Sequence, residues 1–192
     1  TKYINQRIPD IPVNVKYSFK NGSHLQAGAV LRNMYYKDEI EDKDRIVTGW
    51  GASLSGIWQF AQNTSLCFQG VYGKGISNYI QDISGSGLDL VPSATAEGKL
   101  KAFGAWGGYI GFSHNWSKVL TSNIMYSYAR VLDRYGMPTT SYKYAQYAAA
   151  NLFWDFSEYG SCAIEYVFGR RNDFNKDYGN ASRINTMIQY RF

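Results

Sequence analysis

Asn185-Thr186-Met187-Ile188-Gln189-Tyr190-Arg191-Phe192, the C-terminal stretch, decides how the rest of the sequence is interpreted. Thr186, Ile188, Tyr190 and Phe192 alternate with Asn185, Met187, Gln189 and Arg191. This alternation predicts a β-strand with one largely apolar and one polar face. The final aromatic residue suits a strand embedded in lipid, with Phe192 at the hydrocarbon boundary. The alternative at this point is an edge strand of a water-soluble sheet.

Composition favours the membrane interpretation. The 192 residues are 17% aromatic and include 17 Tyr and 19 Gly but only 4 Pro. No run of about 18 apolar residues occurs, so the sequence predicts no transmembrane helix. In a membrane barrel, lipid-facing and lumen-facing residues alternate, so long apolar runs are not expected. We therefore interpret residues 1–192 as a single transmembrane β-barrel domain.

About nine stretches alternate in this way, which predicts an all-β, antiparallel up-and-down barrel. The predicted strands are Ile11–Lys20, Ser23–Tyr36, Val47–Ala61, a fourth with Leu66, Phe68 and Tyr72 on one face, Lys101–Trp116, Leu120–Leu132, Lys143–Phe156, Ser161–Arg171 and, after a loop over Asn172–Gly179, a ninth that closes the chain. Residues 1–10 and the charged stretch Lys37–Arg45 are predicted loops. The connections alternate between tight turns, such as Asn21-Gly22, and longer loops, of which Gly73–Gly98 is the longest. Tight periplasmic turns and long external loops are typical of a bacterial outer-membrane barrel.

Aromatic residues gather near both ends of the predicted strands. Near the tight turns lie Phe19, Trp58, Phe60, Trp116, Trp154, Tyr190 and Phe192. Near the longer loops lie Tyr35, Trp50, Tyr72, Trp106, Tyr128 and Phe168. Amphipathic rings concentrate at the two membrane interfaces, so these residues predict two aromatic girdles in contact with outer-membrane lipid.

The number of strands is unusual, because bacterial single-chain barrels have an even number. We therefore expect this chain to be the C-terminal portion of a larger barrel whose N-terminal strands are missing. A ten-stranded barrel with a misinterpreted first strand is the alternative, although Pro9 and Pro12 lie in that region.

The charges on inward positions predict the solute. The chain carries a net charge of +5, and Glu165 is the only acidic residue expected in mid-strand on the inner face. The basic residues expected there are Lys16, Arg32, Lys143, Arg171 and Arg183. A water-filled pore lined by cations passes anions preferentially, and arginine suits carboxylates. These five residues are the predicted anion path; alternatively, they anchor a neighbouring loop or pair with Glu165 and a loop carboxylate.

Signals for other functions are missing. No Lys/Arg cluster or recognition motif indicates nucleic-acid binding. His24 and His114 cannot share a pocket with Ser and Asp, so we expect no hydrolase and no enzyme. Metal-ligand spacing is also missing, and we expect no metal and no cofactor. Arg130, expected on the outer face, either reaches lipid headgroups or pairs across a subunit interface.

Several segments resemble the DcaP-like porins of Gram-negative outer membranes. They are Arg7-Ile8-Pro9-Asp10, Gly49–Gly56, Val71–Ile80, Ala149 with Asn151–Trp154, Glu165–Arg171 and Gln189-Tyr190-Arg191-Phe192. The resemblance implies a sixteen-stranded homotrimeric porin for passive diffusion of small anions, typically dicarboxylates. It also implies that Arg32, Arg171 and Arg183 contact the anion. The alternative function is a structural or adhesive outer-membrane barrel with a plugged pore.

Overall fold

The computed structural model describes residues 4–5, 7–93, 95–132 and 136–192. The strands are β1 (Ile4–Asn5), β2 (Ile11–Ser18), β3 (His24–Asp38), β4 (Lys43–Ala61), β5 (Thr64–Lys74), β6 (Leu90–Pro92), β7 (Leu100–Ala102), β8 (Gly104–Asn115), β9 (Leu120–Val131), β10 (Tyr142–Asp155), β11 (Gly160–Asp173) and β12 (Tyr178–Tyr190). Two short 3-10 helices, η1 (Ser77–Tyr79) and η2 (Gln81–Ile83), lie between β5 and β6. Among the described helices, none has the length and apolar character needed to cross a membrane.

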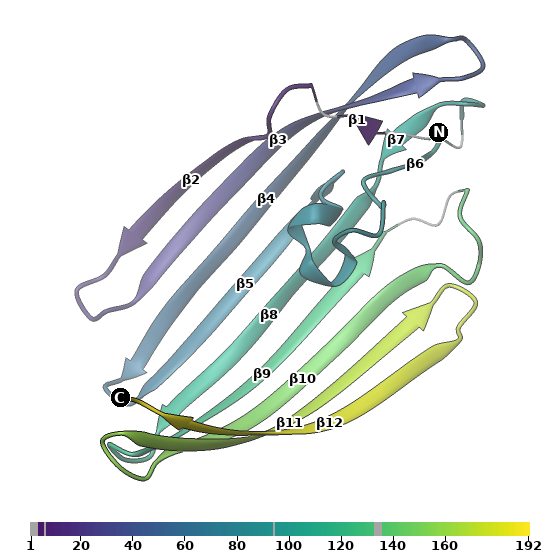
Figure 1. Cartoon of the computed structure of the whole chain (residues 1–192). Coiled ribbons are helices and arrows are strands. Elements are labelled where there is room, and N and C mark those ends of the chain that lie inside the picture. Colours follow the sequence, from purple (N-terminus) through teal and green to yellow (C-terminus); the bar gives the residue numbers. More distant parts are fainter. Residues whose placement is uncertain (1–3, 6, 94, 133–135) are drawn as a thin grey trace.

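The long strands form one curved antiparallel sheet in the order β2-β3-β4-β5-β8-β9-β10-β11-β12 (Figure 1). Each strand pairs with the next long strand in the chain, so the predicted nine-stranded up-and-down meander is confirmed. The sheet is an open trough, with β2 and β12 at its two edges. The short strand β1 also pairs with β3, beyond the end of β2, within a segment that the sequence predicted to be loop.

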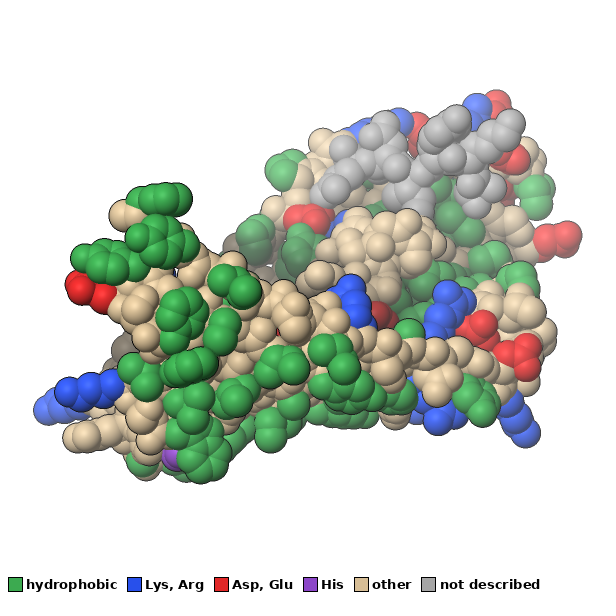
Figure 2. Space-filling view, turned by 60° about the horizontal axis from the view of Figure 1, so that its bottom comes forward, with side chains coloured by type: hydrophobic (Ala, Val, Ile, Leu, Met, Phe, Trp, Pro, Cys, Tyr) green, Lys and Arg blue, Asp and Glu red, His purple; other side chains and the backbone are tan. Residues whose placement is uncertain are grey.

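Register places alternate residues of every strand on the concave or the convex face. One row on the concave face runs through Lys16, Gln26, Ser55, Gln69, Tyr109, Ser127, Tyr147, Gly169 and Ala181. The convex face exposes large apolar side chains, including Val15, Leu54, Ile124 and Ile188. In the face shown by Figure 2, hydrophobic side chains cover much of the surface, and many charged ones lie toward the ends. This division is the one expected for a wall between lipid and water.

The predicted girdle residues occupy the two ends of the convex face. Trp58, Trp116, Trp154, Tyr190 and Phe192 are exposed near the short turns. Trp50 and Trp106 are exposed toward the opposite end, where Trp50 lies 5.7 Å from Tyr72 between ring centroids. Their contact with lipid stays a prediction.

Two predicted loops are shorter in the structure than the sequence predicted. The predicted loop over Lys37–Arg45 is too long, because β3 continues to Asp38 and β4 begins at Lys43, which leaves residues 39–42 as the connection. Asp38 accepts a hydrogen bond from Arg45 across this hairpin at 3.3 Å, so opposite charges support the ladder beyond the apolar stretch. The predicted loop over Asn172–Gly179 is likewise too long, because β11 continues to Asp173 and β12 begins at Tyr178; β12 ends at Tyr190, two residues before Phe192.

Candidate pore lining and constriction

The long connection between β5 and β8 folds into the trough (Figure 1). We call residues 75–103, described except for residue 94, the inward segment. Its base is closed where the Gly75 amide donates to the Phe103 carbonyl at 2.7 Å. Gly75 has a φ of +71°, and a Cβ there would lie 2.5 Å from the Met34 methyl carbon, so the turn requires glycine. The sequence left the position of this loop open.

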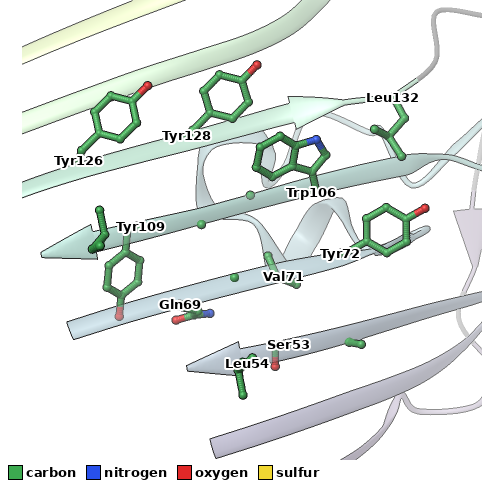
Figure 3. A pocket seen from close by; sticks show the side chains of 15 residues that line it. Ser53, Leu54, Gln69, Val71, Tyr72, Trp106, Tyr109, Tyr126, Tyr128 and Leu132 are labelled. Atoms are coloured by element: carbon green, nitrogen blue, oxygen red, sulfur yellow. The ribbon is translucent and has the colours of Figure 1, made fainter. Parts of the chain in front are cut away.

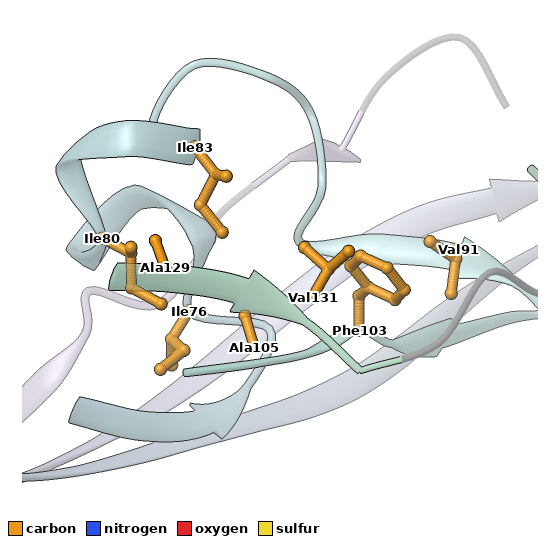
Figure 4. Packing of buried hydrophobic residues seen from close by; sticks show 8 residues of the cluster. All are labelled: Ile76, Ile80, Ile83, Val91, Phe103, Ala105, Ala129 and Val131. Atoms are coloured by element: carbon orange, nitrogen blue, oxygen red, sulfur yellow. The ribbon is translucent and has the colours of Figure 1, made fainter. Parts of the chain in front are cut away.

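An apolar cluster holds the inward segment against the wall (Figure 4). Ile76, Ile80, Ile83, Val91 and Phe103 of the segment pack with Ala105 of β8 and Ala129 and Val131 of β9. Burying each large side chain stabilises the packed state by about 1.5–3 kcal/mol. The three isoleucines follow an i, i+4, i+7 spacing, and this spacing in the sequence indicates a helical turn with one apolar face that needs a packing partner.

Arg32 provides a polar anchor for the same segment. Its side chain, 5% exposed, donates from Nε to Asp10 at 3.0 Å and from Nη1 to Asp89 at 2.9 Å. It also donates to the Gly75 carbonyl. Arg32 therefore ties the inward segment and the region before β2 to β3, which is the anchoring role that the sequence left open. Because two carboxylates offset its charge, we expect Arg32 to add little to the electrostatic potential inside the trough.

Further hydrogen bonds extend this anchor. Asp89 accepts from the Ser77 amide and hydroxyl, both at 2.8 Å. The Tyr79 hydroxyl donates to Asp10 at 2.6 Å. Burial and this hydrogen bond to the Asp10 carboxylate raise the pKa of the Tyr79 phenol. Near the other end of the segment, the Tyr142 hydroxyl donates to Asp82.

The inward segment leaves a space along the wall. A cavity of about 540 Å³ lies between Tyr79 and Asp82 of the segment and Gln69, Tyr109 and Tyr147 of the wall. A smaller cavity of about 210 Å³ lies toward β2 and β3. These residues bring hydroxyl, amide and carboxylate groups from both the segment and the wall to a cavity whose lining is otherwise largely apolar.

The structure does not gather the five predicted anion-path residues at one point. Lys16 on β2 and Arg183 on β12 face the trough from its opposite edges. Both are exposed, and neither forms an ion pair with a described residue. Arg171 faces inward but pairs with Asp173 at 2.9 Å, and Lys143 lies where the register between β10 and β11 shifts. Their contact with a solute stays a prediction.

Glu165 belongs to a row of amides rather than to an ion pair. Asn185 donates to its carboxylate at 2.9 Å, and Asn151 donates at 3.4 Å. Asn123 in turn donates to the Asn151 oxygen at 2.7 Å. These residues are register neighbours on β9 to β12, so they form a polar strip across the inner wall. The alternative pairing of the cations with Glu165 is therefore not seen among the described residues.

A curved meander with an apolar convex face and a polar concave face belongs to the class of transmembrane β-barrel walls. The fold is that of the outer membrane channel DcaP of Acinetobacter baumannii, with a TM-score of 0.79 at 18% identity over 98% of this chain. The predicted resemblance to DcaP-like porins is thus confirmed at the level of the fold. The match covers 53% of the DcaP chain, so this chain spans about half its length.

A second solved structure, the NanC porin, matches with a TM-score of 0.46 and 11% identity over 95% of this chain and 93% of that one. No protein-family model matches the sequence. No curated protein matches it either.

Proposed function

We propose that this chain is the C-terminal portion of a bacterial outer-membrane porin through which small anions such as dicarboxylates diffuse passively, without catalysis. The observation that carries the proposal is the inner face, on which Lys16 and Arg183 are exposed without a carboxylate partner among the described residues. Glu165, the mid-strand acid, is instead occupied by amides. The surplus of free cations favours anions in a water-filled pore.

The directions of the two edge strands support the proposal that further strands are needed to close the barrel. The two edge strands, β2 and β12, run in the same direction because the sheet has nine strands of alternating direction, counting both edges. An antiparallel barrel can close only if an odd number of strands is added, which makes the total even. About seven more would give sixteen, a number found in porins with an aqueous channel. We propose that these strands precede this chain in the complete protein and that three copies associate.

Planar-bilayer recording of the complete protein under a salt gradient tests the transport proposal. We expect a steady conductance with a reversal potential that indicates anion preference. The double variant Lys16→Gln with Arg183→Gln should move the reversal potential toward cations, because it removes two inner-face charges that no described carboxylate pairs with. Arg170→Gln is the matched control, since Arg170 points outward and donates to Asn172 at 3.0 Å. Cation preference of the unmodified channel would reject the selectivity.

The alternative is a structural or adhesive barrel with a plugged pore. The observation that favours it is the inward segment, which is anchored to the wall by both the apolar cluster and Arg32. This alternative predicts no steady conductance from the complete protein. Chemical cross-linking in detergent, followed by mass measurement, tests the trimer separately from conduction.

A further inference from the structure

The convex face contains a depression that the transport proposal does not explain. It has a volume of about 1200 Å³ and opens across β4, β5, β8 and β9 (Figure 3). Gly70 and Gly108 face each other at its floor, and Leu54 and Ile110 flank them. A Cβ added at Gly70 would have no heavy atom within 4 Å, so the hollow exists because this side chain is missing.

Aromatic side chains border the depression on the side of the longer loops. Tyr72, Trp106 and Tyr128 come from the three neighbouring strands β5, β8 and β9 (Figure 3). The Trp106 and Tyr128 rings lie 4.9 Å apart, and Tyr128 stacks on Tyr144 at 5.5 Å. Such rings concentrate where headgroups meet hydrocarbon. The hollow therefore extends from the expected interface into the apolar zone, which is the path of a lipid acyl chain.

Two cations stand beside this aromatic border. Arg130 lies directly opposite Trp106 on the convex face, and Lys74 lies in the next row, nearer the longer loops. Both are exposed, and neither has an ion pair or hydrogen bond from its side chain to a described residue. Strands β5, β8 and β9 contain no acidic residue. Long basic side chains in this position reach the phosphates of the membrane surface.

We propose that the depression is a specific site for one phosphorylated membrane lipid, with an acyl chain over Gly70 and Gly108 and the phosphate on Arg130 and Lys74. The two cations lie two strands and one row apart, roughly 12 Å between backbones, so both long side chains can converge on one headgroup. A guanidinium binds phosphate oxygens in a bidentate manner.

Charge argues for an anionic lipid rather than a second copy of the chain. On the long strands, the convex face offers one acidic side chain, Asp44, among the described residues, and Arg7 already pairs with it at 2.8 Å. A second copy placed on the depression would bring apolar side chains but no free carboxylate for Arg130 or Lys74. A phosphate supplies the missing charge.

Quenching of tryptophan fluorescence by bromine-labelled lipid tests the site. The complete protein is reconstituted in phosphatidylcholine vesicles and titrated with phosphatidylglycerol that carries brominated acyl chains. The Trp106→Phe variant isolates the signal of Trp106. We expect anionic brominated lipid to quench Trp106 at a lower mole fraction than brominated phosphatidylcholine does.

Two sets of variants distinguish binding of the lipid headgroup from binding of the acyl chain. Arg130→Gln with Lys74→Gln should raise the half-quenching mole fraction of the anionic lipid roughly 30-fold, since each basic residue contributes about one kcal/mol to lipid-phosphate binding. Gly70→Leu should remove the quenching of Trp106 by filling the hollow. Arg170→Gln and Gly169→Leu are the controls, because Arg170 already contacts Asn172, and Gly169 is an equally open glycine on the inner face.

Two results would overturn the proposal. Equal quenching by both lipids, unchanged in the double variant, would show that the depression holds only bulk lipid. Loss of oligomers in Gly70→Leu, with no effect of the charge variant on quenching, would show that the depression is a subunit contact. Heat-modifiable gel mobility confirms that each variant has folded, and conductance is measured separately, so a failure here does not bear on transport.

Discussion

Replacing Arg32 by methionine tests how the inward segment is held. The substitution keeps much of the side-chain volume but removes the donors to Asp10, Asp89 and the Gly75 carbonyl. The apolar cluster that also holds the segment is left intact. The effect therefore reports on the polar anchor alone.

The expected loss of docking free energy follows from the hydrogen bonds that Asp89 and Asp10 keep in the variant. Removing one partner of a buried ion pair costs about 3–5 kcal/mol. Asp89 keeps the two donors of Ser77, and Asp10 keeps the Tyr79 hydroxyl, so we take the lower limit of about 3 kcal/mol. At about 1.4 kcal/mol per factor of ten, the ratio of docked to undocked segment falls roughly 100-fold.

Single-channel recording of the complete protein measures this ratio. We expect the Arg32→Met channel to move often to a level of higher conductance, because the undocked segment no longer narrows the trough. Asp89→Asn should change the channel in the same direction but less. The matched control is Arg171→Met, whose ion pair with Asp173 is 57% exposed at the arginine and is worth about 0–1 kcal/mol. A folded Arg32→Met channel with unchanged transitions would refute the reasoning.

Three further predictions test the two faces of the wall. Ile188→Arg should lower the free energy of unfolding in lipid vesicles by about 2–4 kcal/mol, because Ile188 is 84% exposed on the convex face. Gln189→Arg, on the concave face, should change this free energy little, and equal effects of the two variants in urea titrations would contradict the assignment of faces. Glu165→Gln should shift the reversal potential further toward anions, and an unchanged potential would place this residue outside the ion path. A membrane-impermeant thiol reagent should label Cys67, on the concave face, but not Cys162, on the convex face; the reverse pattern, read by mass spectrometry, would contradict the register.

Alternation was sufficient to locate the strands and their faces. Every long strand of the structure overlaps the alternating stretch that predicted it, and Lys16 and Arg183 face inward as expected. Strand ends were harder to predict, because β3 and β4 continue past the apolar stretch with pairs such as Asp38 and Arg45. A stretch of charged residues has no apolar alternation, so the sequence indicates a loop there even where the backbone hydrogen bonds between the two strands continue.

The candidate constriction could not be predicted from local patterns. Ile76, Ile80 and Ile83 have a recognisable spacing, but their partners Ala129 and Val131 lie about fifty residues away on β9. Arg32 has the inward position expected of a pore cation, yet Asp89, which offsets it, lies in a segment that the sequence left without a place. A contact between residues so distant in the chain depends on how the sheet curves.

The sequence by itself determined the class of fold, because a strand in a membrane wall must alternate between lipid and water at every second residue, and that requirement is local. Only the tertiary structure decided which inner charges stay free. Arg32 is neutralised by carboxylates brought from before β2 and from the inward segment, whereas Lys16 and Arg183 meet none among the described residues. The physical reason is that charge compensation depends on distance in space, which alternation along a strand does not specify.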